Sequence, residues 1–175
     1  MKLPLAYYGA PILRKKCKRV DKINDELRQL IHDMEETMMS LDGIGIAAPQ
    51  VHHDLALFLV RVPKETESGE PEEEQTMVFI NPKILEHSEE HWFRGEGCLS
   101  IPKVYGTVER PLRIKVEATD LNGSQFVHEY SDLEARAIMH ENDHINGVLF
   151  IDRVQGKERQ ELDSALRAIK KKYAK

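Results

Sequence analysis

The segment HENDH, residues 140–144, places two histidines four residues apart, with a glutamate directly after the first. A helix advances about 100° per residue, so positions i and i+4 share one face. His140 and His144 can therefore bind one metal ion, and Glu141 on the same flank can reach a water molecule without binding the metal. Two metal ligands and a separate proton acceptor are the groups that metal-dependent hydrolysis needs. The pattern can also arise by chance, in roughly a few of every hundred chains of this composition.

Local signals predict that this segment is helical. Ser131 and Glu134 have capping-box spacing, and an apolar stripe follows them. Gly147, directly after Asn146, is placed to end the helix. The two histidines are therefore expected in the last turns of a helix of about four turns.

Length and charge limit the possible classes of protein. A chain of 175 residues with 41% hydrophobic residues suits one domain, spanning residues 1–175. A net charge of -5 argues against a general nucleic-acid binder, so direct DNA binding is not expected.

Cysteine usage and hydropathy indicate the compartment. Only two cysteines occur, too few for a disulfide scaffold, so free thiols and a reducing compartment are expected. No stretch of about 18 apolar residues and no signal or transit peptide is present, which predicts no membrane association and a bacterial cytoplasmic location.

Periodicity predicts a mixture of helices and strands. Helices are expected at 23–41, around HENDH, and at 157–173, and strands at 55–62, 76–85, 112–120 and 124–131. Asn122-Gly123 predicts a hairpin between the last two strands. The glutamate-rich connector at 63–75 is predicted to be a solvated, mobile loop, and the methionines of the first helix to be core packing.

A catalytic zinc-type site needs a third protein ligand besides two histidines. Cys98, within GEGCLSIP, offers a thiolate directly after Gly95 and Gly97, which permit a tight turn, although burial as a small hydrophobe is the commoner fate of a lone cysteine. An extended zinc-endopeptidase motif would require histidine where Phe150 stands. Glu158 and Glu161 remain alternative carboxylate ligands downstream.

The segment GIGIAAPQ, residues 43–50, is a further candidate. Its glycines permit close backbone approach, and Gln50 supplies an amide donor that can stabilise an oxyanion. Taken alone, the segment is more typical of a helix stop followed by a turn and small-residue packing.

Taken together and in this order, GIGIAAPQ, EGCLS and HENDH resemble the three motifs of the peptide deformylase family. The similarity extends to YYGAPILRKKCKRV near the start, INP at 80–82 and GVLFIDR after the predicted metal helix. The resemblance implies an α+β fold, with antiparallel sheets packed around a central metal-binding helix and with an N-terminal and a C-terminal helix. It also implies metal-dependent removal of the N-formyl group from the formylmethionine of new polypeptides, with release of formate.

The resemblance implies a role for each motif residue. One divalent metal ion per chain would be ferrous iron in cells, with zinc or nickel as substitutes. Glu141 would act as general base and then acid, and Gln50 with the backbone N–H of Leu99 would stabilise the oxyanion. The metal ligands would be Cys98, His140 and His144.

Substrate binding follows from the same resemblance. N-formylmethionyl peptides would pair with backbone near Ile44, Gly45 and Gly97. The methionine side chain is expected in an apolar slot beside Ile44, lined by the helix face one turn before His140, namely the Arg136 stem and Ala137. Tyr105, where some members carry arginine, leaves preference beyond the first substrate residue open.

Charged residues elsewhere carry two further expectations. Glu96, Arg110 and Asp143 are candidates to orient the ligating histidines, although each is individually more typical of a surface or capping charge. Residues 157–175 hold seven basic and three acidic residues. This excess of basic residues is typical of a solvated helix face. The resemblance to the family suggests a second interpretation, in which this segment docks on the ribosome.

Two rival functions remain open from the residues alone. A zinc endopeptidase with Glu161 as third ligand would cleave internal peptide bonds and would not need Cys98. A non-catalytic metal-binding protein would retain metal without depending on Glu141. Neither rival explains why GIGIAAPQ and EGCLS accompany HENDH.

Overall fold

The computed structural model describes residues 1–63, 68–69 and 74–173. Its four α-helices are α1 (Asp25–Ser40), α2 (Asp132–Ile145), α3 (Gly156–Glu161) and α4 (Asp163–Tyr173). Short 3-10 turns are η1 (Pro11–Arg14), η2 (Ala48–Val51) and η3 (Phe150–Arg153). The strands are β1 (Gly45–Ala47), β2 (Leu57–Val60), β3 (Met77–His87), β4 (His91–Cys98), β5 (Ile101–Pro111), β6 (Arg113–Thr119) and β7 (Gln125–Ser131).

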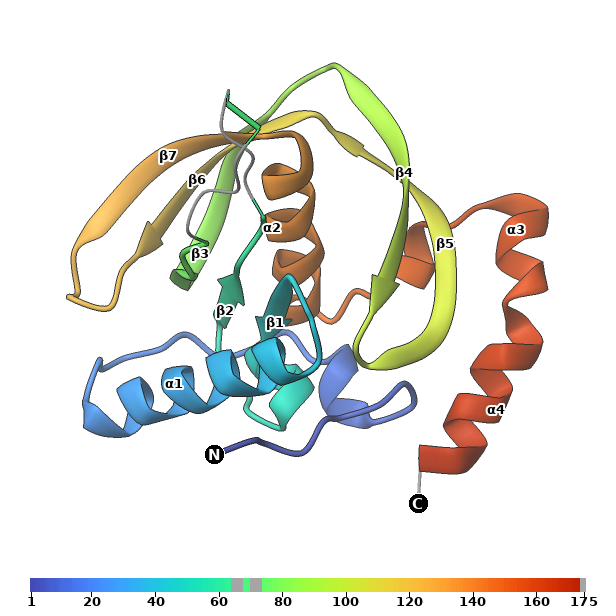
Figure 1. Ribbon diagram of the computed structural model, residues 1–175, viewed down its shortest axis with the longest axis horizontal. Coiled ribbons are helices and arrows are strands. Elements are labelled where there is room, and N and C mark those ends of the chain that lie inside the picture. Colours follow the sequence, from blue (N-terminus) through green and yellow to red (C-terminus); the bar gives the residue numbers. More distant parts are fainter. Residues whose placement is uncertain (64–67, 70–73, 174–175) are drawn as a thin grey trace.

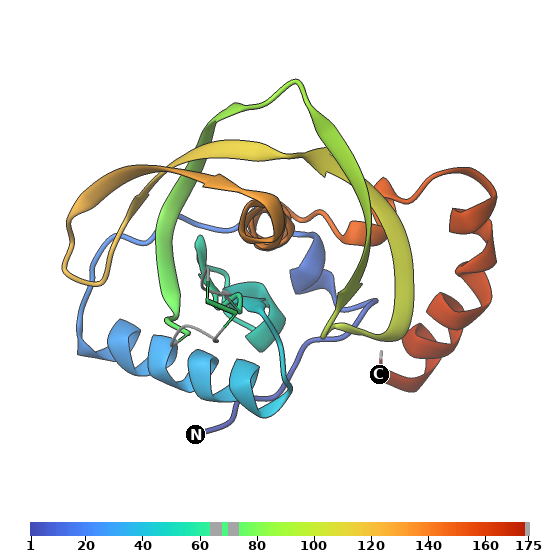
Figure 2. The same ribbon diagram turned by 45° about the horizontal axis from the view of Figure 1, so that its top comes forward.

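The strands form two antiparallel sheets around one helix. A five-stranded sheet has the order β1-β2-β3-β6-β7, and β4 pairs with β5 in a separate two-stranded sheet. Figures 1 and 2 show α2 running between these sheets, with α1 beside β1 and β2 and with α3 and α4 outside β5. The predicted α+β architecture around a central helix is confirmed.

The apolar interior lies on several sides of α2. One cluster joins Ile138 of α2 to Phe58 and Phe79 of the five-stranded sheet. A second cluster joins β5 to α4, and a third joins α1 to β1 and β2. Because α2 is held from the sheet side by the first cluster, its opposite face is available to the β4-β5 pair.

Helix α1 begins and ends close to the predicted 23–41. Asn24 caps it by accepting a hydrogen bond of 2.9 Å from the Leu27 N–H. Met34 and Met38 are fully buried, which confirms the predicted core packing for these two methionines, whereas Met39 of the same helix is 47% exposed.

The predicted hairpin between 112–120 and 124–131 is confirmed as β6 and β7, which pair from Arg113 with Ser131 to Thr119 with Gln125. Its turn is held by Asp120, whose carboxylate accepts hydrogen bonds from the backbone N–H groups of Asn122 and Ser124. The strands predicted at 55–62 and 76–85 correspond to β2 and β3.

Three predictions need correction. β4 and β5 were not predicted as a strand pair, because β4 contains two glycines and mostly exposed residues and so lacks an apolar alternation. The helix predicted at 157–173 is divided at Leu162 into α3 and α4. Ser131 precedes α2 as predicted, but its hydroxyl makes no capping hydrogen bond in the described structure.

Parts of two other predictions lie outside the described residues. Most of the connector at 63–75, predicted as a mobile loop, belongs to them, as does Lys175 of the basic segment. Within the described residues, no helix has the length and apolar character needed to cross a membrane. Cys17 and Cys98 are both free thiols, as predicted. Burial raises the pKa of the Cys17 thiol to about 11, which keeps it protonated at neutral pH.

Candidate active site

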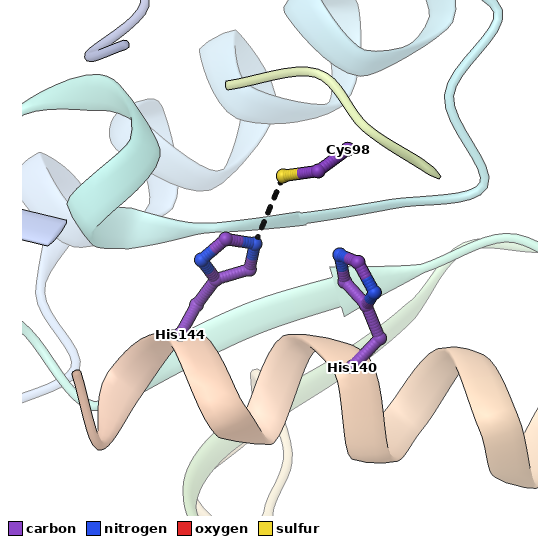
Figure 3. Close-up of side chains that lie close together, drawn as sticks. All are labelled: Cys98, His140 and His144. Atoms are coloured by element: carbon purple, nitrogen blue, oxygen red, sulfur yellow. Dashed lines mark hydrogen bonds between the residues drawn. The ribbon is translucent and has the colours of Figure 1, made fainter. Parts of the chain in front are cut away.

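Three side chains with metal-binding atoms converge between α2 and the end of β4. The ligand atoms of Cys98, His140 and His144 all lie within 4.8 Å of one another (Figure 3). The Cys98 Sγ is 3.3 Å from His144 Nε2. In a tetrahedral zinc site, ordinary bond lengths place sulfur and nitrogen ligands about 3.5 Å apart, so this spacing suits a shared ion.

A break in strand pairing delivers Cys98 to this site. The register of β4 against β5 shifts between Gly97 and Cys98: Gly97 pairs with Tyr105, whereas Cys98 pairs with Ile101. Such irregularities redirect a side chain and are common beside active sites. An added Cβ at Gly97 would lie 2.8 Å from the Tyr105 ring, so a larger residue would require this exposed ring to move.

A buried carboxylate orients one of the histidines. Glu96 Oε1 lies 2.9 Å from His140 Nδ1, which leaves the other ring nitrogen to face the metal site. Arg110 donates to both oxygens of Glu96, at 2.6 and 2.9 Å, and also to Asp143 at 3.0 Å. Arg153 binds the same Asp143 at 2.7 and 2.9 Å. Glu96, Arg110 and Asp143 thus form a buried network rather than separate surface charges.

The charges around the histidines favour a cation at this position. Burial lowers the pKa of His140, but hydrogen bonds to Cys98 and Glu96 outweigh it and hold that pKa well above its ordinary value. Burial, followed by the charge of His140, holds the pKa of His144 well below its ordinary value, so that ring is neutral. A divalent ion would supply the positive charge that a proton on His140 otherwise brings. Cys98, His140 and His144 therefore fit a metal ion.

Glu141 is buried and faces the cleft. Its Oε2 atom has no hydrogen-bond partner among the described residues, which leaves it available to a water molecule or substrate. Burial raises the pKa of Glu141 to about 7, while the charge of His140 acts in the opposite direction. A pKa near the operating pH is the property that general acid-base catalysis requires.

Gln50 is fixed with its amide donor toward Cys98. Its Oε1 accepts a hydrogen bond of 2.9 Å from the Ala47 N–H, which determines the orientation of the amide. The opposite nitrogen donates to Ser100 Oγ at 3.1 Å and lies 3.5 Å from the Cys98 Sγ. The predicted amide donor is therefore placed beside the predicted metal site.

A cleft of about 560 Å³ opens over these groups. Its lining includes Cys98, His140 and Glu141. It also includes every residue predicted to bind the substrate or the oxyanion: Ile44, Gly45, Gln50, Gly97, Leu99, Arg136 and Ala137. His144 lies deeper, at 1% exposure.

Arg136 has a contact that sequence reasoning missed. It is buried, and its guanidinium binds Glu96 Oε2 at 2.6 Å and the carbonyls of Val108 and Trp92 at 3.0 and 2.9 Å. Its position four residues before His140, on the same helix face, was the available signal. The guanidinium turns to Glu96, so only the remainder of Arg136 is free to line the cleft.

The alternative carboxylate ligands lie elsewhere. Glu158 accepts a hydrogen bond from the Thr107 backbone N–H of β5. Glu161 ends α3, outside the β4-β5 pair, and is not in the Cys98, His140 and His144 cluster. The structure therefore gives no support to a zinc endopeptidase that uses either residue.

Comparison with known proteins identifies the family. The sequence model of the polypeptide deformylase family matches residues 2–160. The chain belongs to the peptide deformylase family. It is 46% identical over 152 residues to the peptide deformylase of Microchaete diplosiphon, covering 87% of this chain and 79% of that protein.

Solved deformylase structures share the fold. The peptide deformylase of Thermotoga maritima has a TM-score of 0.80 at 37% identity, covering 89% of this chain and 99% of that one. The peptide deformylase of Synechococcus elongatus, solved in complex with actinonin, has a TM-score of 0.80 at 42% identity, with 98% and 86% covered. The chain is thus a metal-dependent hydrolase that removes N-formyl groups from nascent polypeptides.

Proposed function

We propose that Cys98, His140 and His144 bind one catalytic metal ion and that Glu141 is the general base and acid of deformylation. The observation that carries this proposal is the convergence of the three ligand atoms beside a buried carboxylate whose Oε2 lacks a protein partner. A divalent metal ion, when bound, supplies Lewis-acid activation of water and of the formyl oxygen.

The protein groups then carry the proton and the developing charge. Glu141 Oε2 accepts a proton from the attacking water and returns it to the leaving amine nitrogen. The Gln50 amide and the backbone N–H of Leu99 donate to the oxyanion of the tetrahedral intermediate. Removing one such donor costs about 3 kcal/mol of barrier, or a hundredfold in rate.

Substrate binding uses the rest of the cleft. The backbone of Ile44, Gly45 and Gly97 pairs with the N-formylmethionyl peptide as a strand. The methionine side chain lies against Ile44 and Ala137 and the aliphatic stem of Arg136, whose guanidinium is already occupied by Glu96.

Residues 1–175 act as a single catalytic domain, and iron(II) is the metal in cells, with zinc or nickel in purified protein. A Cys/His/His set suits iron and zinc alike, so availability decides which one is bound. The low cysteine content supports a bacterial cytoplasmic location. The net charge of -5 supports peptide rather than DNA as partner.

Formate release from formyl-Met-Ala-Ser by anaerobically purified protein tests the proposal, with metal content measured on the same samples. Wild type should release formate with about one metal per chain, Glu141→Ala should retain the metal without turnover, and Cys98→Ser should lose metal. Near-normal hydrolysis by metal-loaded Glu141→Ala would refute the assigned base. Internal peptide cleavage by Cys98→Ser would restore the endopeptidase alternative.

The basic C-terminal end of α4 is further proposed to dock on the ribosome near the exit of the nascent chain. Lys170, Lys171 and Lys172 occupy its last turn, where they suit an RNA surface as well as the helix dipole. Glutamate at all three positions should reduce co-sedimentation with ribosomes without changing formyl-Met-Ala-Ser hydrolysis. Unchanged co-sedimentation at low salt would contradict this docking.

A further inference from the structure

The two proposed oxyanion donors belong to separate parts of the fold. Gln50 lies in η2, directly after β1 of the five-stranded sheet, whereas Leu99 follows β4 of the two-stranded sheet. Within the described residues no strand pairing joins the two sheets, so other contacts must set the distance between the Gln50 amide and the Leu99 N–H. That distance matters because both donors must reach one oxygen atom at the same time.

A short N-terminal segment, residues 5–8, connects these two parts of the fold, and we call it the strap. The Ala6 N–H donates to the Gln50 carbonyl at 2.7 Å, and the Tyr8 N–H donates to the Ser100 carbonyl at 2.9 Å. Ala6, Gln50 and Ser100 are each at most 1% exposed, so water does not compete for these hydrogen bonds. The strap therefore binds the residue that carries one donor and the residue next to the other.

A side-chain hydrogen bond joins the same two residues. Gln50 Nε2 donates to Ser100 Oγ at 3.1 Å, while Gln50 Oε1 accepts from the Ala47 N–H at 2.9 Å. Ser100 is thus connected to Gln50 directly through its hydroxyl and indirectly through the strap. Because Leu99 and Ser100 share a peptide bond, a shift of the strap that moves Ser100 would also move the Leu99 N–H.

The strap is anchored from outside the catalytic cleft. Ala6 is buried in the apolar cluster that joins β5 to α4 and includes Leu166, and Tyr8 packs against this cluster without lining the cleft. The ring of Tyr7 stacks on Tyr173 of α4, with 3.8 Å between centroids and 15° between planes. Figures 1 and 2 show the end of α4 near the N-terminal segment. The position of the strap is therefore set by groups that do not contact the metal site.

We infer that the strap positions the oxyanion site and that Tyr8 is a positioning residue for deformylation, acting through the backbone of Ser100 and Gln50. The inference rests on the proposed function, which assigns the Gln50 amide and the Leu99 N–H to the oxyanion. The strap fixes the spacing of these two donors before the substrate arrives. The donors then need no reorganisation as negative charge develops on the formyl oxygen.

Truncation of the Tyr8 ring tests this role in formate release from formyl-Met-Ala-Ser by metal-loaded enzyme. Tyr8→Ala removes the packing that holds the strap and should lower kcat about tenfold, part of the roughly hundredfold loss that removal of a whole oxyanion donor causes. KM and metal content should stay within about twofold of wild type, because the methionine pocket and the three metal ligands are kept. Tyr8→Phe keeps the ring and should restore kcat.

A double-mutant cycle with Gln50→Ala separates positioning from general destabilisation. When Gln50 is absent, the spacing between two donors no longer matters, so adding Tyr8→Ala should lower kcat by less than about threefold. Leu162→Ala is the matched control: Leu162 packs against the same apolar cluster but on its β5 side, where a Cβ added at Gly106 would lie 3.6 Å from Leu162 Cδ1. This control should lower the melting temperature and leave kcat near that of wild type.

Replacement of Ala6 by lactic acid tests the strap even if Tyr8→Ala fails to fold. The change converts one backbone amide to an ester, so it removes the N–H that binds the Gln50 carbonyl and keeps every side chain. The kcat should again fall about tenfold with little change in KM or metal content, as expected for partial misplacement of one donor.

The outcomes separate this inference from the proposed function. A kcat within twofold of wild type in the lactic acid protein overturns the strap as a positioning element while deformylation stands. A tenfold loss for Tyr8→Ala that is undiminished in the Gln50→Ala background does the same. Wild-type turnover by Gln50→Ala would instead remove the oxyanion role of Gln50, and absence of formate from metal-loaded wild type would remove the proposed function.

Discussion

Gly45 lies against Glu141, and the smallest substitution there should misplace that carboxylate. A Cβ added at Gly45 would lie 2.7 Å from Glu141 Oε1, 2.8 Å from its Cγ and 2.9 Å from its Cδ, whereas ordinary contacts begin at 3.4 Å. Glu141 is 4% exposed, so it must shift by about half an ångström or more against packed neighbours. Displacing a catalytic group by about 1 Å costs about a hundredfold in rate, and Gly45→Ala should therefore lower kcat by 10- to 100-fold.

The assay is formate release from formyl-Met-Ala-Ser by iron-loaded protein, with metal content measured on the same sample. Alanine keeps the backbone N–H and C=O of residue 45, so strand pairing and KM should change little. Gly95→Ala is the matched control: it also lines the cleft, but its added Cβ would have no neighbour within 4 Å. A kcat within threefold of wild type for metal-loaded Gly45→Ala would refute the reasoning that this contact positions Glu141.

Three further predictions concern the metal network and acid stability. Glu96→Gln removes the charge that binds His140 and should weaken metal affinity by about 10- to 100-fold, measured by competition with a chromophoric chelator. Chelation of the bound metal should lower the melting temperature of wild type, because an ion present at 1,000 times its Kd stabilises the folded state by about 4 kcal/mol; an unchanged melting curve would contradict a site formed only on folding. Burial opposes ionisation of Asp152, but hydrogen bonds from Arg14 and the Leu149 N–H hold its pKa below the ordinary value. The stabilisation that ionised Asp152 gives the folded state is present above the pKa of this group in the unfolded chain. It is lost as pH falls through the lower pKa of Asp152 in the folded protein. Asp152→Asn should therefore cost about 1 kcal/mol or less in urea unfolding at pH 7, and the difference should begin to fall near pH 4 and vanish only below the lowered pKa of the folded state.

Features formed by residues close together in the sequence, such as helix α2 and the β6-β7 hairpin, could be predicted from the sequence. Helix α2 carries His140, Glu141 and His144 within five residues, so one helical repeat brings them together without any long-range information. The β6-β7 hairpin likewise depends on Asn122-Gly123 and its two flanking strands. In both cases the chemistry of a few adjacent residues determines their geometry.

The β4-β5 pair could not be predicted in the same way. Phe93, Gly95 and Gly97 are exposed along β4, since within the described part of the chain β4 pairs with β5 alone. The strand therefore carries no apolar alternation, and its pairing register is set by residues across the hairpin. The position of Cys98 relative to α2 depends on the register shift at Gly97, which no local pattern encodes.

Charge pairing explains how so polar a helix occupies the centre of the fold. Arg136, His140 and Asp143 of α2 are largely or wholly buried, which would be prohibitive for isolated charges. Glu96 and Arg110 from the β4-β5 pair face these three side chains and form hydrogen bonds of 2.6–3.0 Å with them. Removing one partner of such a network leaves an uncompensated buried charge, at a cost of about 3–5 kcal/mol. The strand pair that carries Cys98 therefore also makes the burial of Arg136, His140 and Asp143 possible, and the position of these side chains cannot be explained from α2 alone.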